Sequence, residues 1–211
     1  MAERLVWIDC EMTGLDLRSD ALVEVAVLIT DSELAILDDG FDVLIAPPPG
    51  ALEGMLPVVR EMHFASGLLT AQESTKTTLA QAGEQVLDYV RGHVPDRRKA
   101  PLCGNSIATD RGFLARDMPD LDDHLHYRMV DVSSIKELCR RWYPKVYYAA
   151  PEKHGGHRAL ADIQDSVAEL RYYRSTIFTA EPGPDTTAAR AAAGAAPSPL
   201  PSPQPSHAVS D

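Results

Sequence analysis

The sequence predicts an α/β fold in which helices flank a mixed β-sheet. Two observations lead to this fold class. Apolar runs typical of strands open the chain, and from Pro101 onward short strand-like segments alternate with amphipathic helical ones. Such an order is typical of a sheet whose faces are covered by helices. The 211 residues are enough for one well-packed domain, and too few for two ordinary ones.

Three strands are expected early in the chain. Residues 5–8 and 22–30 are nearly continuous apolar runs, as in strands that are buried on both faces. Apolar and polar residues alternate toward the end of residues 34–45, which favours a third strand. Residues 101–103 and 127–132 are expected to form two further short strands.

Four helices are expected from apolar residues at helical spacing. They cover residues 79–90, 107–118, 133–142 and 160–170. Asn105 or Ser106 is the expected N-cap of the second of these helices.

We expect a domain boundary near residue 180. The last 31 residues, 181–211, include 7 prolines and 8 alanines, and in residues 197–205 proline recurs at every second position. Such a segment has little to bury, so we expect a disordered, partly polyproline tail after a folded domain of residues 1–180.

The charge balance limits the kind of partner. The chain carries 31 acidic and 20 basic residues, a formal net charge of −11. The tail contributes three acidic residues and one arginine, or −2, so the domain retains −9. This balance argues against a non-specific duplex binder, which needs a strongly positive surface. It remains compatible with an enzyme that grips a short nucleic acid through a few phosphates and metal ions.

The cysteines and the apolar segments bear on the cellular compartment. Cys10, Cys103 and Cys139 lie far apart, and no C-x-x-C occurs, which argues against a disulfide scaffold or a cysteine-rich zinc site. No segment approaches the roughly 20 apolar residues that a membrane helix needs. We therefore expect a cytoplasmic protein without a membrane partner.

Acidic residues occur at three places where strands or turns lead into helices. Asp9 and Glu11 are two residues apart at the expected end of the first strand, so their side chains share a side. Asp110 follows a Gly-Asn-Ser turn, and His157 and Asp162 follow Gly155-Gly156. Each pattern alone also fits a solvated acid or a loop histidine. Two carboxylates side by side at a buried strand end, as for Asp9 and Glu11, repel each other, and a divalent cation between them would remove this cost.

The combination of these motifs resembles the DEDDh exonucleases. The matching positions are Asp9, Glu11, Asp110, His157 and Asp162. The resemblance implies an RNase H-like mixed five-stranded sheet, four carboxylates that hold two divalent cations, Mg²⁺ or Mn²⁺, and His157 as the general base.

Longer strings narrow the resemblance to the oligoribonuclease family. They include Trp7 to Asp16, Cys103 to Ser106, His126 to Arg128, Asp131 to Ser133 and Ser166 to Arg174. The similarity spans roughly residues 5–174. It implies a homodimeric 3′-to-5′ exoribonuclease that cleaves dinucleotides and other short RNA to 5′-mononucleotides. It also implies a set of substrate-binding residues. Leu15 lies between two bases, Arg128, Ser133 and Lys136 hold the terminal 5′-phosphate, and Ser106 contacts the substrate as well. Tyr127 and Arg128 are expected to come from the partner subunit.

The sequence departs from the family at one base-binding position. Members often carry a tryptophan that stacks on a base before an Ala-Ser-Gly-Leu segment, and here Val58 stands near that place. A base can still lie on valine, but aromatic stacking is lost.

Two other functions compete with this hypothesis. One is a DNA-directed DEDDh exonuclease of the proofreading type, which a panel of labelled substrates would distinguish. The other is an inactive RNase H-like interaction module, against which stands the presence of all five signature residues.

Overall fold

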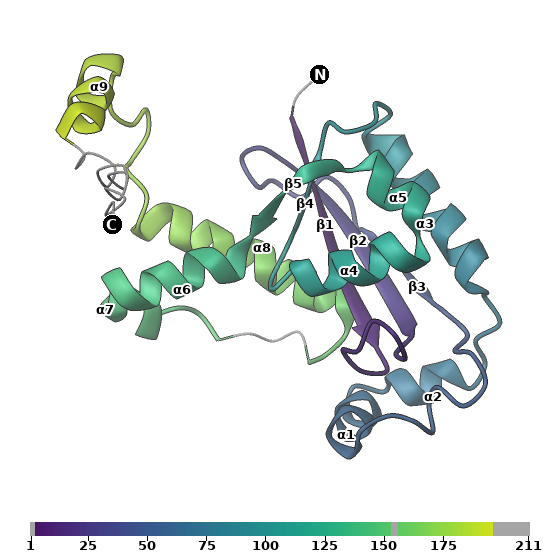
Figure 1. The fold of residues 1–211 in the computed structure, drawn as a ribbon. Coiled ribbons are helices and arrows are strands. Elements are labelled where there is room, and N and C mark those ends of the chain that lie inside the picture. Colours follow the sequence, from purple (N-terminus) through teal and green to yellow (C-terminus); the bar gives the residue numbers. More distant parts are fainter. Residues whose placement is uncertain (1–2, 153–155, 196–211) are drawn as a thin grey trace, which may run out of the picture. The chain divides into compact units, whose positions relative to one another are not determined.

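The computed structural model describes residues 3–152 and 156–195, and it places a five-stranded sheet between helices (Figure 1). The strand order is β3-β2-β1-β4-β5. The long strands β1 and β2 pair in antiparallel fashion, as do β2 and β3, whereas β4 runs parallel to both β1 and β5. The mixed five-stranded sheet that the sequence predicts is therefore confirmed. The strands are β1 (Arg4–Met12), β2 (Leu22–Asp31), β3 (Phe41–Leu44), β4 (Pro101–Gly104) and β5 (His126–Asp131).

Helices cover both faces of the sheet. One buried apolar cluster joins β1 and β2 to α3, α4 and α5, and a second joins the opposite face to α6 and α8. The described helices are α1 (Pro57–Ala65), α2 (Leu68–Gln72), α3 (Leu79–His93), α4 (Ala108–Asp117), α5 (Pro119–His124), α6 (Val132–Trp142), α7 (Pro144–Tyr148), α8 (Ala159–Thr176) and α9 (Thr186–Ala195).

The alternation of β1 decides which side chains reach which helices. Val6, Ile8 and Cys10 belong to the cluster beneath α3 and α4, whereas Trp7 belongs to the one beneath α8. Trp7 is fully buried, and its indole N–H donates to Thr30 Oγ1 at 3.0 Å. Side chains two residues apart on a strand share a face, so Asp9 and Glu11 follow Trp7 to the α8 face.

Besides α9, four short helices in the described part of the chain were not predicted from the sequence: α1, α2, α5 and α7. Three of them, α1, α5 and α7, begin with Pro57, Pro119 and Pro144. Proline is a good first residue of a helix because its missing N–H would have no partner there, but in a sequence it is easily taken only as a stop. The expected N-cap of α4 was also wrong: Ile107 occupies that position without a side-chain capping bond.

The C-terminal part forms a separate unit, with the division between Ile177 and Phe178. The expected disorder of residues 181–211 fails over Thr186–Ala195, which form the exposed helix α9. This segment consists mostly of alanine, the residue with the highest helix propensity. The proline-rich residues 197–205 lie outside the described residues. Within the described part of the chain, no helix is both long and apolar enough to cross a membrane.

Candidate active site

The site begins on the second half of β1. The expected strand end at Ile8 was too early, because β1 continues to Met12 and pairs with β2 over this whole length. Asp9 and Glu11 therefore stand within a rigid central strand, on the face that α8 covers. The ladder shifts register between Glu11 and Met12. Glu11 is only 8% exposed, so its carboxylate has lost most of its contact with water.

Asp162 reaches the same place from α8. It lies in the first turn of that helix, where its backbone N–H donates to Arg158 O at 3.0 Å. One oxygen each from Asp9, Glu11 and Asp162 lies within 4.8 Å of the other two. Three carboxylates that converge in this way form a candidate site for a hard divalent cation, which prefers oxygen ligands.

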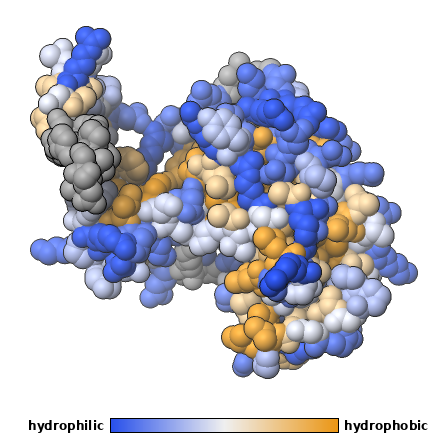
Figure 2. Space-filling model, viewed as in Figure 1, coloured by the Kyte–Doolittle hydropathy of each residue, from blue (hydrophilic) through white to orange (hydrophobic). Residues whose placement is uncertain are grey.

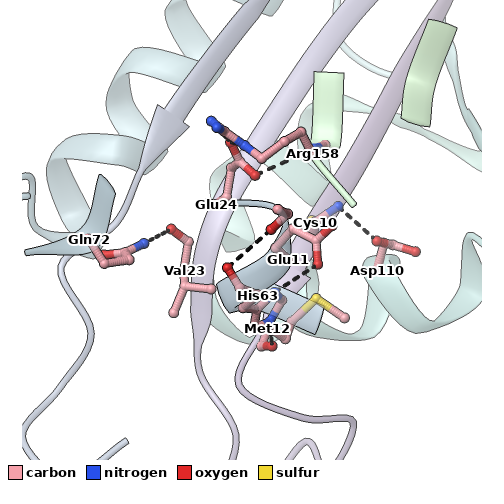
Figure 3. Close-up of polar contacts among 11 residues, drawn as sticks. Cys10, Glu11, Met12, Val23, Glu24, His63, Gln72, Asp110 and Arg158 are labelled. Carbon is pink, nitrogen blue, oxygen red and sulfur yellow. Dashed lines mark hydrogen bonds and ion pairs between the residues drawn. The ribbon is translucent and has the colours of Figure 1, made fainter. Parts of the chain in front are cut away.

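Asp110 approaches from the other side of β1. It lies in the first turn of α4, and its carboxylate accepts a hydrogen bond from the backbone N–H of Cys10 at 3.0 Å (Figure 3). Gly104 allows this approach, because a Cβ at that position would lie 3.0 Å from Ile8 O and 2.9 Å from the Ile107 side chain. The turn from β4 into α4 thus passes close to β1 and brings Asp110 to the cluster.

Burial and mutual repulsion shift the proton affinities of the acids. Burial, followed by the charges of Asp110, Glu11 and Asp162, raises the pKa of Asp9 to about 9. Burial also raises the pKa of Glu11 to about 8 and that of Asp110 to about 7. A set of carboxylates that resist ionisation at neutral pH is typical of functional sites, and a bound cation reverses the shift.

His157 lines the same hollow as these acids. The hollow measures about 430 Å³, and His157 is exposed at its rim with a left-handed backbone of φ 61°. The residues around it are Asp9, Cys10, Glu11, Met12, Leu15, Asn105, Ser106, Thr109, Asp110, His157, Asp162 and Ser166. The structure thus brings together all five predicted DEDDh positions. Gly155, named with this motif, lies outside the described residues.

Leu15 lies at the edge of the hollow on a braced loop. Its side chain is 73% exposed, which is unusual for leucine. The loop is closed by Asp20, whose carboxylate accepts hydrogen bonds from Thr13 Oγ1 and from the Asp16 N–H, both at 2.9 Å. Gly14 packs directly on that carboxylate, because a Cβ there would lie 2.5 Å from an Asp20 oxygen. The loop therefore presents Leu15 to solvent in a fixed position.

Three of the predicted phosphate-binding residues form one network next to the hollow. The Ser106 N–H lies 2.9 Å from Ser133 Oγ, and the two hydroxyls are 3.1 Å apart. Ser133 Oγ donates to Asn105 Oδ1 at 3.0 Å, while Asn105 Nδ2 donates to Glu169 Oε2 at 3.2 Å. Lys136 Nζ is 3.1 Å from Glu169 Oε1. Ser133 also belongs to the first turn of α6, whose N-cap is Asp131.

Tyr127 and Arg128 are not brought into the hollow. They lie on the edge strand β5, where Tyr127 is 73% exposed. The Arg128 guanidinium lies over the Tyr127 ring at 5.6 Å from its centroid, and Arg128 Nε donates to the Tyr127 hydroxyl at 3.2 Å.

Val58 lies on α1 in an exposed apolar group. Figure 2 shows apolar residues gathered over this helix, and Leu56, Val58 and Phe64 are all more than half exposed. The surface near the family's tryptophan position is thus apolar here as well.

Three residues of the site's surroundings were missed in the sequence: Glu24, Arg158 and His63. Glu24 was detectable as the single charged residue within the apolar run of β2. His63 is fully buried on α1, with Nε2 at 2.8 Å from Met12 O and Nδ1 at 3.7 Å from Glu11 Oε2 (Figure 3). No sequence pattern pointed to His63, because only the docking of α1 brings it beside β1.

Comparison with solved structures places the fold among exonucleases. Exonuclease I from Methylocaldum szegediense superposes with a TM-score of 0.58 at 19% identity, covering 82% of this chain and 41% of that one. A zinc-bound complex of E. coli exonuclease I with single-stranded DNA gives a TM-score of 0.63 at 14% identity, covering 83% and 41%. This chain thus spans about two fifths of those proteins, and the likeness concerns the fold.

Sequence comparison identifies the family. The exonuclease family model RNase_T matches residues 6–170. An oligoribonuclease from Mycobacterium sp. (strain KMS) is 64% identical over 187 residues, 89% of this chain and 87% of the relative. One from Streptomyces coelicolor is 65% identical over 191 residues, or 90% and 95%. Among the sequence-based alternatives, these relatives favour oligoribonuclease over a DNA-directed exonuclease. The chain belongs to the oligoribonuclease family of exonucleases.

Proposed function

We propose that this protein is a 3′-to-5′ exoribonuclease that hydrolyses short oligoribonucleotides, especially dinucleotides, to 5′-mononucleotides. The observation that carries the proposal is the convergence of Asp9, Glu11 and Asp162 within 4.8 Å, in one hollow with Asp110 and His157. The curated relatives at 64% and 65% identity, which are oligoribonucleases, support the choice of substrate.

The acidic residues fit a pair of divalent cations, Mg²⁺ or Mn²⁺. The ligands would be the carboxylates of Asp9, Glu11, Asp110 and Asp162, all oxygen donors of the kind these ions prefer. Burial raises the pKa values of Asp9, Glu11 and Asp110, and repulsion among the acids adds to the shift for Asp9 and Glu11. A cation would offset both effects. When bound, the ions supply Lewis-acid activation of the phosphodiester and stabilise the charge of its transition state.

His157 acts as the general base in this proposal. Imidazole is the side chain best suited to proton transfer near neutral pH. His157 supplies an imidazole at the rim of the hollow. It takes a proton from the water that attacks the last phosphodiester. The bond between phosphorus and the 3′ oxygen of the preceding nucleotide then breaks, which releases a 5′-mononucleotide and leaves a 3′-hydroxyl on the remaining RNA.

The preference for short substrates rests on Leu15 and on the polar network next to the hollow. In this proposal Leu15, which is exposed at the edge of the hollow, lies between the two bases of a dinucleotide. Ser106, Ser133 and Lys136 form a polar network at the start of α6. In this proposal the serine hydroxyls and the Lys136 ammonium contact the terminal 5′-phosphate. An additional nucleotide at the 5′ end would have to displace this contact.

We also propose a cytoplasmic homodimer in which Tyr127 and Arg128 serve the partner's site. Both lie on an exposed sheet edge and outside the hollow of their own chain. Large apolar side chains continue from β5 across α6 to α7: Met129, Leu138, Trp142, Tyr143 and Tyr148 are all exposed. Trp142 and Tyr148 are 66% and 82% exposed, an unusual amount of aromatic surface for residues facing water.

The decisive test is digestion of 5′-labelled RNAs of two to seven nucleotides with Mg²⁺, with Mn²⁺ and with a chelator. We expect cleavage only with metal, a rate that is highest for the 5′-phosphorylated dinucleotide, and a fall with each added nucleotide. Equal rates for all lengths would contradict the phosphate cap. Faster cleavage of DNA of the same lengths would instead favour the DNA-directed alternative.

A further inference from the structure

An ion pair between a buried glutamate and a partly exposed arginine lies directly beside the carboxylate cluster without belonging to it. Glu24, on β2, is opposite Glu11 in the ladder and is only 1% exposed. Arg158 binds it with two nitrogens, Nε at 3.1 Å and Nη2 at 2.8 Å from Oε1 (Figure 3). The second oxygen, Oε2, accepts the Ala159 backbone N–H at 3.4 Å. Two like charges opposite each other on neighbouring strands are unfavourable, and Arg158 offsets that repulsion.

The contacts of Glu24 argue against a role as a metal ligand. Both carboxylate oxygens already accept hydrogen bonds, one from a guanidinium and one from a backbone amide. The group of converging acids in the described residues comprises Asp9, Glu11 and Asp162, without Glu24. Glu24 is therefore occupied by the chain itself.

Arg158 lies in the sequence between two residues of the proposed site, His157 and Asp162. It follows His157, the general base of the proposed reaction, and it is the N-cap residue of α8 with an extended backbone, φ −123° and ψ 122°. Its side chain does not cap the helix, but its carbonyl accepts the Asp162 N–H at 3.0 Å. The Glu24 carboxylate thus holds the residue between His157 and the helical turn that carries Asp162.

The His157 backbone needs such an anchor. His157 and Gly156 both adopt positive φ, 61° and 63°, and the His157 side chain is exposed. A left-handed conformation is unfavourable for a non-glycine residue and persists only where neighbouring contacts fix it. Arg158 is the next residue in the chain, and its two hydrogen bonds to Glu24 fix the backbone beside His157.

We propose that the Glu24–Arg158 pair is a positioning device for the reaction, which fastens the His157 loop and the start of α8 to β2. The inference rests on the proposed function, since it assigns the pair an effect that passes through His157. Misplacing a catalytic group by about 1 Å can cost as much as 10²-fold in rate. Loss of the pair should therefore lower kcat and leave metal and RNA affinity nearly intact.

The main test is the paired variant Glu24→Gln/Arg158→Met, which removes both charges and keeps similar volumes. We expect kcat on a dinucleotide to fall about 10- to 100-fold, with KM and Mn²⁺ affinity changed less than about threefold. The matched control is Glu33→Gln/Arg174→Met. That ion pair also joins the segment after β2 to α8, but at the far end of the helix. It should leave kcat unchanged.

A double-mutant cycle shows whether the effect passes through His157. In a His157→Ala background the paired variant should cost less than about threefold in kcat, because the group that it misplaces is gone. Additive losses in the cycle would overturn the proposal. A loss of Mn²⁺ affinity of more than about tenfold in the paired variant would overturn it too, since Glu24 would then act on the metal.

One further measurement does not depend on turnover, and one further variant preserves the charge of the pair. Amide hydrogen exchange at Ala159 should accelerate in the paired variant, and unchanged protection there would contradict the anchor. Arg158→Lys retains the charge and loses the two-pronged contact, so its kcat should lie between wild type and the paired variant. A kcat equal to that of wild type would contradict the need for the pair. Failure of wild type to cleave RNA, by contrast, would refute the proposed function.

Discussion

Glu11 on β1 and Glu24 on β2 face each other in the sheet, but the groups that surround their carboxylates are different. Both are buried, 8% and 1% exposed. Glu24 is held by an arginine and a backbone amide. Glu11 instead shares a 4.8 Å cluster with Asp9 and Asp162, and its pKa is raised to about 8. The chain can therefore neutralise a buried acid with its own cation, and one strand away it leaves a group of acids for a cation from outside.

Within one sheet, the ion pair therefore has a structural role and the acidic cluster has a chemical one. An ion pair such as Glu24–Arg158 fixes two segments of the chain relative to each other, and its two charges balance. A cluster such as Asp9, Glu11 and Asp162 costs folding free energy because burial and repulsion disfavour ionised carboxylates. A cost of this kind is typical of residues that are retained for catalysis or metal binding.

The largest effect should come from removing one charge of the cluster. Asp9→Asn should lower dinucleotide turnover by several orders of magnitude, because Asp9 is one of the residues that would hold the proposed cations. The variant should fold normally, and in chelator it should be at least as stable as wild type, because a source of repulsion is gone. Single-turnover cleavage and thermal unfolding measure the two effects. Turnover close to that of wild type would refute the metal assignment.

The next effect concerns His157, which lies beside the cluster and is not a proposed ligand. His157→Ala should lower kcat by about 10²–10⁴, the usual contribution of a general base. Mn²⁺ titration and RNA binding should be nearly unchanged, because the carboxylates remain. Weaker RNA binding at an unchanged kcat would make His157 a binding residue instead.

A smaller effect is expected at Arg128, far from the cluster on β5. Arg128→Ala should slow cleavage of the 5′-phosphorylated dinucleotide by about tenfold, the value of one charge-assisted hydrogen bond. Cleavage of a seven-nucleotide RNA should change little, so the length preference should flatten. If the arginine acts across a dimer, dilution to monomer should have the same effect. An unaltered length profile in the variant would remove Arg128 from the phosphate site.

The smallest effect should follow from removing the C-terminal segment. A chain that ends after Ala180 lacks α9, which has no buried residue. Stability should change by no more than about 0.5 kcal/mol, as for other exposed positions, and turnover should not change. Chemical unfolding and dinucleotide hydrolysis check both. A clear loss of stability would show that this segment stabilises the domain.

The sheet and the acidic residues could be predicted because both follow local rules. The apolar run of β2 and the spacing of Asp9 and Glu11 are visible in the sequence, and the family strings add Asp110, His157 and Asp162. Their convergence follows from strand alternation and from the parallel pairing of β1 with β4.

The surroundings of the acids could not be predicted because they depend on docking. His63 reaches Met12 from a helix 51 residues away in sequence, and Arg158 reaches Glu24 over 134 residues. Nothing in the local sequence of either residue reveals its partner. The short proline-initiated helices were missed for a different reason, since their few residues give too little periodicity to detect.

The most direct test of the central claim is the pH dependence of folding stability with and without Mg²⁺. The pKa values of Asp9, Glu11 and Asp110 are about 9, 8 and 7 in the folded chain, against ordinary values of 3.8 to 4.5. Between pH 5 and pH 9 the folded, metal-free protein therefore holds protons that the unfolded chain has already lost. Its stability must fall as pH rises, by up to about 1.4 kcal/mol per pH unit for each such proton.

Urea unfolding at pH 6 and at pH 9 measures this fall. In chelator we predict that wild type loses clearly more stability between the two pH values than Asp9→Asn does. Saturating Mg²⁺ should abolish most of the fall in wild type, because the bound cation favours the ionised acids. A stability that stays level or rises toward pH 9 in chelator, or that Mg²⁺ leaves unchanged, would contradict the conclusion that these acids are held for a cation.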